Sequence, residues 1–400
     1  MYIERTITKI IEKASKQFKV LLLTGARQVG KSTVLKNCDR NREYVTLDDI
    51  TEREMALNEP KLFLQRHKAP VIIDEIQYAP NLLSYIKMEV DNSDKKGLYW
   101  LTGSQQFHMM KNVSESLAGR VAILELMGLS LAEINKTESN PFIPTLEYIQ
   151  EQRNNQHSYK LQEIFKQIYN GSYPALNNNE DNDRELFYRS YLRTYLERDI
   201  RDLTSVSDEM TFLKFIRSVA ARTGQVLKYS TLANEVGISQ PTAKSWLSIL
   251  ISSGIVYLLE PYYLNITKRM TKMPKIYFLD TGLCAYLTGW NTPEVIEKGA
   301  MSGAFFETFV ISEIIKSYQH NGKNAPLFWY RDFDNKEVDL LVERNGKLYP
   351  IEIKLTANPD KSMVKNFSLI KNKGEGGLIC MYDKDIPISE TVNVIPVNYL

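Results

Sequence analysis

The sequence has few residues of the types that build disulfide frameworks and zinc sites. Its 400 residues include only three cysteines and four histidines, all of them far apart. No CxxC pair and no histidine cluster is present, so we expect neither a disulfide scaffold nor a zinc module. Since disulfides are typical of oxidising compartments, this cysteine usage predicts a reducing, cytoplasmic location.

Long hydrophobic runs and a one-sided charge are also lacking. No apolar run approaches the roughly 20 residues that a membrane-spanning helix needs, so we expect no membrane association. Residues 1–18 carry charges at helical spacing among isoleucines, which predicts an amphipathic helix and not a signal peptide. With 50 basic and 48 acidic side chains the net charge is only +2, so nucleic-acid binding would need a local basic patch.

Length and composition predict a globular protein of more than one domain. The 43% apolar and 24% charged content is typical of a folded chain, and one domain usually spans roughly 100–200 residues. Residues 20–134 alternate continuous apolar runs with helical patterns, which predicts α/β structure with a parallel sheet buried on both faces. We predict four parts: a parallel-sheet domain at 1–135, a linker and helical segment at 136–221, a winged helix-turn-helix at 222–290, and a mixed α/β domain at 291–400.

A glycine-rich segment after the first apolar run carries the strongest motif. It reads GxxxxGKS, directly after residues 20–23 and directly before a helical pattern. Glycines let backbone N–H groups face phosphates, and the following helix N-terminus adds positive potential. The motif predicts a P-loop for ATP, in which Lys31 reaches the β- and γ-phosphates and the Ser32 hydroxyl binds Mg²⁺; a chance glycine-rich turn is the alternative. The expected nucleotide-binding residues are Gly25, Ala26, Arg27, Gln28, Val29, Gly30, Lys31, Ser32 and Thr33.

Two further apolar runs end in polar residues that suit the same site. Residues 71–73 lead into Asp74 and Glu75 and resemble a Walker B segment. Asp74 would hold Mg²⁺ through water, and Glu75 would orient or deprotonate the attacking water. The alternative is a pair of acidic surface residues at the end of a strand, which would be favoured if the P-loop motif were absent. The next run ends in LTGS, where Ser104, in preference to Thr102, could sense the γ-phosphate; a strand-to-helix cap is the alternative.

Three charged residues outside these motifs are additional candidates. Arg120, in SLAGR, is the candidate arginine finger, which would offset charge that develops on the transferred phosphoryl group. A surface arginine or a structural ion pair is the alternative for this residue. Asp48 and Asp49 close another strand pattern and could have a secondary polar role near the same sheet edge.

Residues 230–256 have the pattern of a helix-turn-helix. Ser230 and Ser239 can cap two short helical patterns, which are separated by Gly237. A hairpin-like stretch follows, with four basic residues and no acidic residue in its second half. This basic wing predicts DNA contacts through residues 228–275, whereas a packing module is the alternative. The four basic residues are Lys268, Arg269, Lys272 and Lys275.

An Asn-Gly turn at 345–346 predicts a hairpin that brings acidic residues together. Counted outward from this turn, Asp339 faces Glu352. Glu337 then faces Lys354, and alternation places all four side chains on one face. Two opposed carboxylates repel each other, so the pair favours a cation between them.

This arrangement resembles the core of the PD-(D/E)xK nucleases, in which Asp339, Glu352 and Lys354 would form the active centre. That family also uses a glutamate on a preceding helix, and Glu307 lies on the apolar face of such a helical pattern. The resemblance implies a second metal site. The alternatives are an ordinary Glu337–Lys354 ion pair in a nuclease relic without activity, and a register broken by a bulge because Pro350 fits poorly inside a strand.

The order of the motifs resembles one family over nearly all 400 residues: GARQVGKST, VIIDEIQ, LTGSQ, SLAGR, YLERDI, FLDTGL, GAFFE and EVD…IEIK. In this order they resemble the prokaryotic AAA-type P-loop ATPases of the AAA+ superfamily whose C-terminal domain of unknown function has a PD-(D/E)xK nuclease-like fold. The resemblance implies a P-loop NTPase sheet joined to a winged helix and a nuclease-like domain. YLERDI, with Glu197, Arg198 and Asp199, and FLDTGL, with Asp280, match family landmarks for which we expect interdomain or capping contacts.

These observations lead to one expected function and two alternatives from other classes. The expected function is Mg²⁺-dependent ATP hydrolysis, in which the nucleotide state controls the C-terminal half. The alternatives are a nucleotide-gated DNA-binding switch that hydrolyses little ATP, and a metal-dependent nuclease. ATP and Mg²⁺ are the expected cofactors, and DNA and a second copy of the chain are candidate partners.

Overall fold

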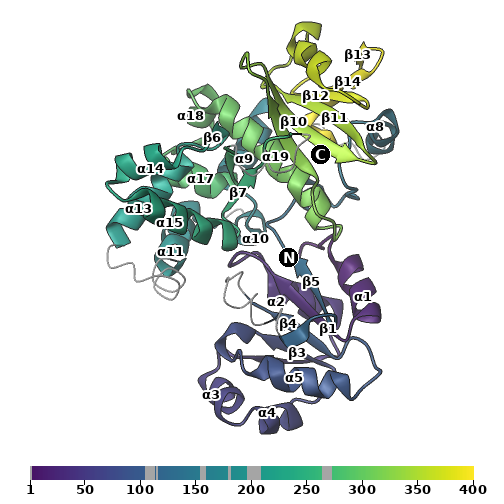
Figure 1. Ribbon diagram of the computed structural model, residues 1–400, viewed down its shortest axis with the longest axis vertical. Coiled ribbons are helices and arrows are strands. Elements are labelled where there is room, and N and C mark those ends of the chain that lie inside the picture. Colours follow the sequence, from purple (N-terminus) through teal and green to yellow (C-terminus); the bar gives the residue numbers. More distant parts are fainter. Residues whose placement is uncertain are drawn as a thin grey trace.

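The computed structural model describes residues 2–103, 113, 116–153, 159–178, 182–195, 209–263 and 273–400. The described residues form three sheets, of five, three and six strands, which are connected by helices. Figure 1 shows the five-stranded sheet at the lower end of the molecule and the six-stranded sheet at the upper end. The helical middle part lies beside them. Within these ranges, no helix has the length and hydrophobicity that crossing a membrane requires.

The N-terminal sheet is parallel, with the strand order β2-β3-β4-β1-β5. In β1, Leu21 and Leu23 join the core on one face, and Val20 and Leu22 join the core on the other. β1, β3 and β4 are buried along their whole length, which confirms the prediction from their continuous apolar runs. The strands are β1 (Val20–Thr24), β2 (Glu43–Thr46), β3 (Val71–Asp74), β4 (Tyr99–Thr102) and β5 (Val121–Glu125).

Helices cover both faces of this sheet. The predicted N-terminal amphipathic helix is α1, which packs with α2 on one face through Ile11 and Leu35. α3, α4 and α5 cover the other face, with Phe63 and Ile86 in its core. The elements are α1 (Thr8–Gln17), α2 (Lys31–Cys38), α3 (Ile50–Asn58), α4 (Pro60–Arg66), η1 (Ile76–Tyr78) and α5 (Leu82–Asp91).

The middle part contains two helices joined by a turn at the residues for which a helix-turn-helix is predicted. Gly237 ends the first of these helices in the left-handed conformation, at φ +79°, and the Ser239 hydroxyl caps the second helix by accepting from the Thr242 N–H. Ser230 does not cap the first helix as predicted, because it lies inside that helix, which begins at Tyr229 after Lys228. The helices are α9 (Leu161–Asn170), α10 (Pro174–Asn177), α11 (Arg184–Tyr195), α13 (Glu209–Ala220), α14 (Tyr229–Val236), α15 (Gln240–Ser252), α17 (Thr281–Leu287) and α18 (Pro293–Lys298).

An antiparallel sheet with the order β6-β8-β7 accompanies these helices. Its strands are β6 (Gln225–Val226), β7 (Val256–Leu259) and β8 (Lys275–Phe278). β8 is buried along its whole length and packs near α19 (Ser302–Gln319). The sheet therefore links the helix-turn-helix to the C-terminal part.

The C-terminal sheet is mixed, with the order β13-β14-β12-β11-β10-β9. Asn345 and Gly346, at φ +53° and +73°, form the predicted two-residue turn, and Arg344 pairs with Lys347. Pro350 does not break this hairpin; the irregularity lies on the other side of β10, in its pairing with β9. The elements are β9 (Leu327–Arg331), β10 (Glu337–Arg344), β11 (Lys347–Ile353), η4 (Lys361–Leu369), β12 (Gly376–Cys380), β13 (Pro387–Ser389), β14 (Val392–Pro396) and η5 (Val397–Tyr399).

The segment that follows α7 (Leu131–Asn135), predicted to be a linker, is instead packed on the C-terminal part. Phe142 is fully buried; its N–H donates to Ser317 Oγ at 3.0 Å, and its carbonyl oxygen accepts from the Tyr318 hydroxyl at 2.7 Å. In α8 (Leu146–Gln152), the Tyr148 hydroxyl donates to the backbone of Tyr399. The few apolar residues of this polar segment are enough to bury it against α19 and the C-terminus.

Candidate functional site

The P-loop connects β1 to α2 at the carboxyl edge of the parallel sheet. Gly25 and Gly30 have φ angles of +143° and +94°, which residues with a side chain rarely adopt. A Cβ atom on Gly25 would lie 2.1 Å from the carbonyl oxygen of Leu126, just after β5. The backbone geometry therefore requires both motif glycines, and the loop is held against the end of a neighbouring strand.

The Lys31 side chain lies within this loop. Lys31 is the first residue of α2 and is 7% exposed. Its ammonium group donates to the carbonyl oxygens of Gly25 and Ala26 at 3.0 and 2.9 Å. Phosphate oxygens carry more negative charge than carbonyl oxygens, so a bound triphosphate would replace these partners with stronger acceptors.

Ser32 and Asp74, the two predicted magnesium residues, are in direct contact. The Ser32 hydroxyl donates to Asp74 Oδ1 at 2.7 Å. The Thr102 hydroxyl donates to the same oxygen, and the Tyr44 hydroxyl donates to Oδ2 at 2.7 Å. This convergence follows from the strand order, since β4 lies between β1 and β3 and β2 lies on the outer side of β3. Asp74 is only 6% exposed, and three hydroxyl groups from three different elements orient its carboxylate.

Tyr44 remains a hydrogen-bond donor at neutral pH. Burial, together with the hydrogen bond to Asp74 and the charge of that carboxylate, raises the pKa of the Tyr44 phenol well above its ordinary value. The Lys36 ammonium lies over the Tyr44 ring, 3.3 Å from its centroid. Tyr44 is thus fixed from two sides and holds one oxygen of Asp74 in place.

Glu75 follows Asp74 in the left-handed conformation, at φ +58°. Such a conformation costs a residue with a side chain roughly 1–2 kcal/mol and often marks functional sites. The Glu75 N–H donates to Thr102 Oγ1 at 3.1 Å, and the Gln77 side-chain amide donates to the Glu75 carboxylate. Backbone and side-chain contacts therefore both hold Glu75 beside the Ser32–Asp74 pair.

The donor set at this edge suits magnesium. Mg²⁺ prefers hard oxygen ligands and is usually held by one or two protein oxygens together with water and phosphate oxygens. Ser32, at the start of α2, and Asp74, at the end of β3, supply a hydroxyl and a carboxylate 2.7 Å apart. The residues therefore fit a Mg²⁺ ion that arrives with the phosphates.

The structure changes the assignment of residues around Asp74. Ser104 lies outside the described residues, so its role in sensing the γ-phosphate stays a prediction. Thr102, the less favoured candidate, contacts Asp74. Tyr44 was not predicted, because it belongs to no motif. Its polar group lies on a strand that borders β3, but this can be recognised only when the strand order is known. Asp49 caps α3 by accepting from backbone N–H groups, which is a structural role.

Arg120 does not lie at this site within the same chain. Its carbonyl oxygen accepts from the Val20 N–H at 3.1 Å, which places Arg120 at the amino edge of the sheet, opposite the P-loop. Its guanidinium pairs with Asp91 at the end of α5. Within its own chain Arg120 therefore lies away from the P-loop, and the structural ion pair, which is the alternative for this residue, is present. A role toward a neighbouring copy stays a prediction.

A second polar cluster lies at the hairpin of β10 and β11. The Lys354 ammonium is 3.2 Å from Asp339 Oδ2 and 2.7 Å from Glu352 Oε1. Asp339 also accepts from the Ile353 N–H at 3.0 Å. The structure brings these predicted residues together. The alternative, an ordinary Glu337–Lys354 ion pair, is wrong, because Glu337 pairs with a cation from another part of the chain.

That cation is Lys275, the first residue of β8. Its ammonium lies 2.5 Å from Glu337 Oε1 and 3.3 Å from Glu307 Oε1. Glu307 also accepts from the Tyr277 hydroxyl at 2.6 Å. Burial raises the pKa of Glu307, although Lys275 opposes this effect. β8 and α19 therefore contribute to one charge cluster with β10.

Burial, reinforced by the charge of Asp339, raises the pKa of Glu352 to about 7, against the opposing charge of Lys354. Glu352 Oε2 is buried and has no hydrogen-bond partner. Over the described ranges, no three His, Cys, Asp or Glu side chains are arranged to hold a metal ion, and Lys275 and Lys354 supply the positive charge. Among the described residues, the buried Glu352 Oε2 thus stays without the partner that a buried polar oxygen normally has.

Lys275 also corrects the predicted basic wing. It is only 4% exposed and pairs with carboxylates, so it is not a surface contact for DNA. The sequence pattern led to a wrong prediction for Lys275, because a run of basic residues usually faces solvent. DNA contact through 228–275 therefore stays a prediction that no longer includes Lys275. Three of the four basic residues lie outside the described residues: Lys268, Arg269 and Lys272.

Asp280, in FLDTGL, makes the expected capping contact, whereas an interdomain role stays a prediction. It caps α17 by accepting from the Leu283 N–H at 2.6 Å. It also accepts from the N–H and hydroxyl of Ser172 and from the Tyr188 hydroxyl at 2.6–2.9 Å. Asp280 therefore ties α17 to the segment between α9 and α10 and to α11. Residues 197–199 of YLERDI lie outside the described residues.

Three family models match successive parts of the chain. A model described as an AAA domain matches residues 17–135. Two domains of unknown function, DUF8612 and DUF4143, match residues 161–294 and 302–400. The first match supports an AAA-type P-loop ATPase domain, with nucleotide binding and hydrolysis as its function, at the residues that form the parallel sheet and the P-loop.

The chain is also similar to whole proteins. Uncharacterized proteins of Mycobacterium tuberculosis and Mycobacterium bovis are each 27% identical over 392 residues, which is 98% of this chain and 82% of theirs. An uncharacterized protein of Methanocaldococcus jannaschii is 21% identical over 419 residues, with 92% of this chain and 82% of that protein covered. These similarities extend over all parts of the chain.

Solved structures of ATPases are similar at lower levels. The Walker-type ATPase PABY2304 of Pyrococcus abyssi has a TM-score of 0.42 and 14% identity, and covers 72% of this chain and 96% of its own. The signal-transduction ATPase PH0952 of Pyrococcus horikoshii, with a tetratricopeptide repeat sensor, has a TM-score of 0.28 and 13% identity, and covers 80% and 47%. Both TM-scores are too low to establish a common fold over the whole chain.

Proposed function

We propose that this protein is a Mg²⁺-dependent ATP hydrolase whose nucleotide state acts on its C-terminal half. The single observation that carries this proposal is the contact between Ser32 and Asp74 beside a P-loop whose glycines have the required backbone conformation. A serine after the P-loop lysine and an aspartate at the end of a neighbouring strand together are the usual protein partners of nucleotide-bound Mg²⁺.

Each polar residue of the site has a distinct role in this proposal. The backbone N–H groups of the P-loop and Lys31 bind the phosphates, and Ser32 and Asp74 hold the metal ion. The ion, when bound, neutralises charge on the phosphate oxygens. Tyr44 and Thr102 orient Asp74, and Glu75 orients and deprotonates the attacking water.

Phosphate release from ATP tests the proposal. Lys31→Ala should abolish turnover because the phosphates lose their main cationic partner. Glu75→Gln should bind ATP but stop turnover, since an amide cannot accept a proton from water. Lys13→Ala, at an exposed lysine on α1 of the same domain, is the matched control and should behave as wild type. Turnover that survives Lys31→Ala would show that the site is assigned wrongly.

A second candidate function is metal-dependent cleavage of nucleic acid at the cluster of Asp339, Glu352 and Lys354. One observation favours it: a buried carboxylate oxygen of Glu352 has no partner, in a cluster that already holds two acidic side chains against one lysine. Such an oxygen is costly unless a further cation binds it. The Lys354 ammonium would stabilise negative charge on a phosphate that is attacked there.

Incubation of DNA or RNA with Mn²⁺ or Mg²⁺ tests this candidate. Cutting should be lost in Asp339→Asn and kept in Asp334→Asn, an exposed aspartate in the turn before β10. Lys31→Ala separates the two functions, because nuclease activity that depends only on the metal should survive it. Equal cutting by wild type and Asp339→Asn would identify a contaminating nuclease and remove this candidate.

A further inference from the structure

A buried arginine outside the predicted motifs contacts the P-loop. Arg5, three residues before α1, is 3% exposed. Its Nη1 donates to the carbonyl oxygen of Val29 at 2.9 Å. Its Nη2 donates to the carbonyl oxygens of Met127 at 2.7 Å and Gly128 at 3.2 Å. One guanidinium therefore joins the P-loop to the segment that follows β5.

The contact with Val29 determines where the next N–H group points. A trans peptide is planar, so the carbonyl of Val29 and the N–H of Gly30 point in opposite directions. Because Arg5 holds that carbonyl, the Gly30 N–H is directed to the side of the loop away from Arg5. Gly30 is the residue before α2, at φ +94°, where a P-loop presents N–H groups to phosphate.

Glu133 fixes the guanidinium in this orientation. Its Oε2 accepts from Arg5 Nε at 3.0 Å and from the Ser130 N–H at 3.0 Å, and its Oε1 accepts from the Thr6 N–H at 2.8 Å. Burial opposes the ionised form of Glu133, but the charges of His320 and Arg5 outweigh this effect and lower its pKa. The partner of Arg5 is thus a carboxylate that four charged or polar neighbours stabilise.

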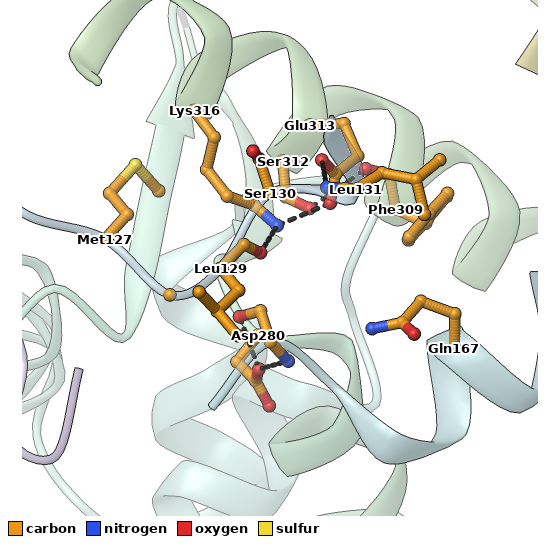
Figure 2. Close-up of polar contacts among 12 residues, drawn as sticks. Met127, Leu129, Ser130, Leu131, Gln167, Asp280, Phe309, Ser312, Glu313 and Lys316 are labelled. Atoms are coloured by element: carbon orange, nitrogen blue, oxygen red, sulfur yellow. Dashed lines mark hydrogen bonds and ion pairs between the residues drawn. The ribbon is translucent and has the colours of Figure 1, made fainter. Parts of the chain in front are cut away.

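The same network reaches the C-terminal part through α19. His320, just after α19, is fully buried, with Nδ1 3.3 Å from Glu133 Oε1. Figure 2 shows two further contacts of α19 with the chain after β5: Lys316 donates to the Leu129 carbonyl oxygen at 2.9 Å, and Glu313 accepts from the Leu131 N–H at 2.8 Å. The segment that Arg5 ties to the P-loop is therefore also tied to the C-terminal half.

We infer that Arg5 is a positioning residue of the nucleotide site, which holds the Val29–Gly30 peptide in the orientation that phosphate binding requires. This inference rests on the proposed nucleotide binding at the P-loop. In this inference Arg5 does not contact a phosphate group. It affects the affinity for the nucleotide through the orientation of the Val29–Gly30 peptide. The inference also connects α19 to the site, since the Glu133 carboxylate that anchors Arg5 contacts His320 as well.

Titration with a fluorescent ATP analogue and Mg²⁺ tests the inference. Arg5→Lys keeps the charge but loses the fork that reaches Val29 and Glu133 together, so affinity should fall about tenfold. Turnover at saturating ATP should change less, because the lost interaction is in binding. In Arg5→Ala, millimolar guanidinium should restore affinity; the same addition should not affect wild type.

Arg42 provides a matched control. It is also a mostly buried arginine of the ATPase domain, and it donates to the carbonyl oxygens of Gly97 and Leu98, at the amino edge of the sheet. Arg42→Lys should lower the melting temperature without loss of affinity in the folded protein. All affinities are measured below the melting midpoint of each variant, so that a structural effect and a binding effect separate.

The outcomes distinguish the inference from the proposed function. If wild type binds no Mg·ATP, the proposed function fails, and the role of Arg5 fails with it. If wild type binds but Arg5→Lys binds equally well, or loses no more affinity than Arg42→Lys, only the role of Arg5 is overturned. If Arg5→Ala does not fold, Arg5→Lys alone decides between these results.

Discussion

Replacing Glu352 with glutamine should stabilise the protein at alkaline pH and leave it nearly unchanged at acidic pH. Glu352 is 6% exposed, and burial with the charge of Asp339 raises its pKa from the ordinary 4.5 to about 7. The folded protein therefore binds this proton more readily than the unfolded chain. The contribution of Glu352 to stability is fully present below pH 4.5 and is lost as the pH rises through 7.

The size of the effect follows from the two pKa values. Each unit corresponds to about 1.4 kcal/mol, so the ionised Glu352 costs roughly 3 kcal/mol at pH 8. Glutamine has nearly the same shape and does not ionise. The pKa of about 7 already includes the attraction of Lys354 for the ionised carboxylate, so the loss of that ion pair is not subtracted again. We expect Glu352→Gln to raise the free energy of unfolding by roughly 3 kcal/mol at pH 8, and by little at pH 5.

Urea unfolding at pH 5 and pH 8, followed by tryptophan fluorescence, measures this difference. Glu390→Gln, at an exposed glutamate of the same C-terminal part, is the control and should shift stability by a similar small amount at both values. Two results would refute the reasoning that burial of the ionised Glu352 carboxylate destabilises the protein. One is a Glu352→Gln protein that is less stable than wild type at pH 8, and the other is the same change in the free energy of unfolding at both pH values.

Three further substitutions test other parts of the structure. Gly25→Ala should abolish nucleotide binding, because its Cβ would overlap the backbone after β5. At Gly237 a Cβ would have no atom within 4 Å, so Gly237→Ala should lower the free energy of thermal unfolding by only about 1 kcal/mol. If both substitutions had the same effect on binding and on unfolding, the close packing of the P-loop would be contradicted. Tyr44→Phe removes one hydroxyl donor from Asp74 and should raise the Mg²⁺ concentration for half-maximal turnover about fivefold; an unchanged Mg²⁺ dependence would exclude this role of Tyr44. Asp280→Asn should lower the free energy of unfolding, measured in urea, by about 2 kcal/mol, because the buried donors of Ser172 and Tyr188 lose a charged acceptor. An unchanged midpoint of urea unfolding would show that these contacts contribute little to stability.

The parts of the fold that local patterns determine could be predicted from the sequence. Continuous apolar runs mark β1, β3 and β4 because these strands are buried on both faces. The turn at Asn345 and Gly346 sets the register of β10 and β11, because a two-residue turn leaves only one way to pair the strands. The P-loop could be predicted because the glycines and the lysine of its motif have a fixed spacing in the sequence.

Contacts between distant segments could not be predicted in this way. Lys275 belongs to a basic run that would normally face solvent, and its partners Glu307 and Glu337 lie far away in the sequence. Tyr44 reaches Asp74 only because β2 is next to β3. Arg5 has no motif around it, since its ligands are backbone carbonyl groups that any residue supplies.

The position of Arg120 could have been predicted. A residue directly before a strand lies at its amino end, whereas the P-loop and Asp74 follow their strands and lie at the carboxyl edge. In a parallel sheet these two edges are opposite. The arginine in SLAGR predicts an arginine finger, and the strand direction places it away from the P-loop of its own chain.

Isothermal titration of the folded protein with Mg·ATP tests the central claim most directly. We predict saturable binding at one site per chain, which is weakened when EDTA removes Mg²⁺ and is lost in Lys31→Ala while the melting temperature of that variant stays near that of wild type. Binding that is equal in wild type and Lys31→Ala, or no binding by a wild-type protein that melts cooperatively, would contradict a nucleotide site at the P-loop.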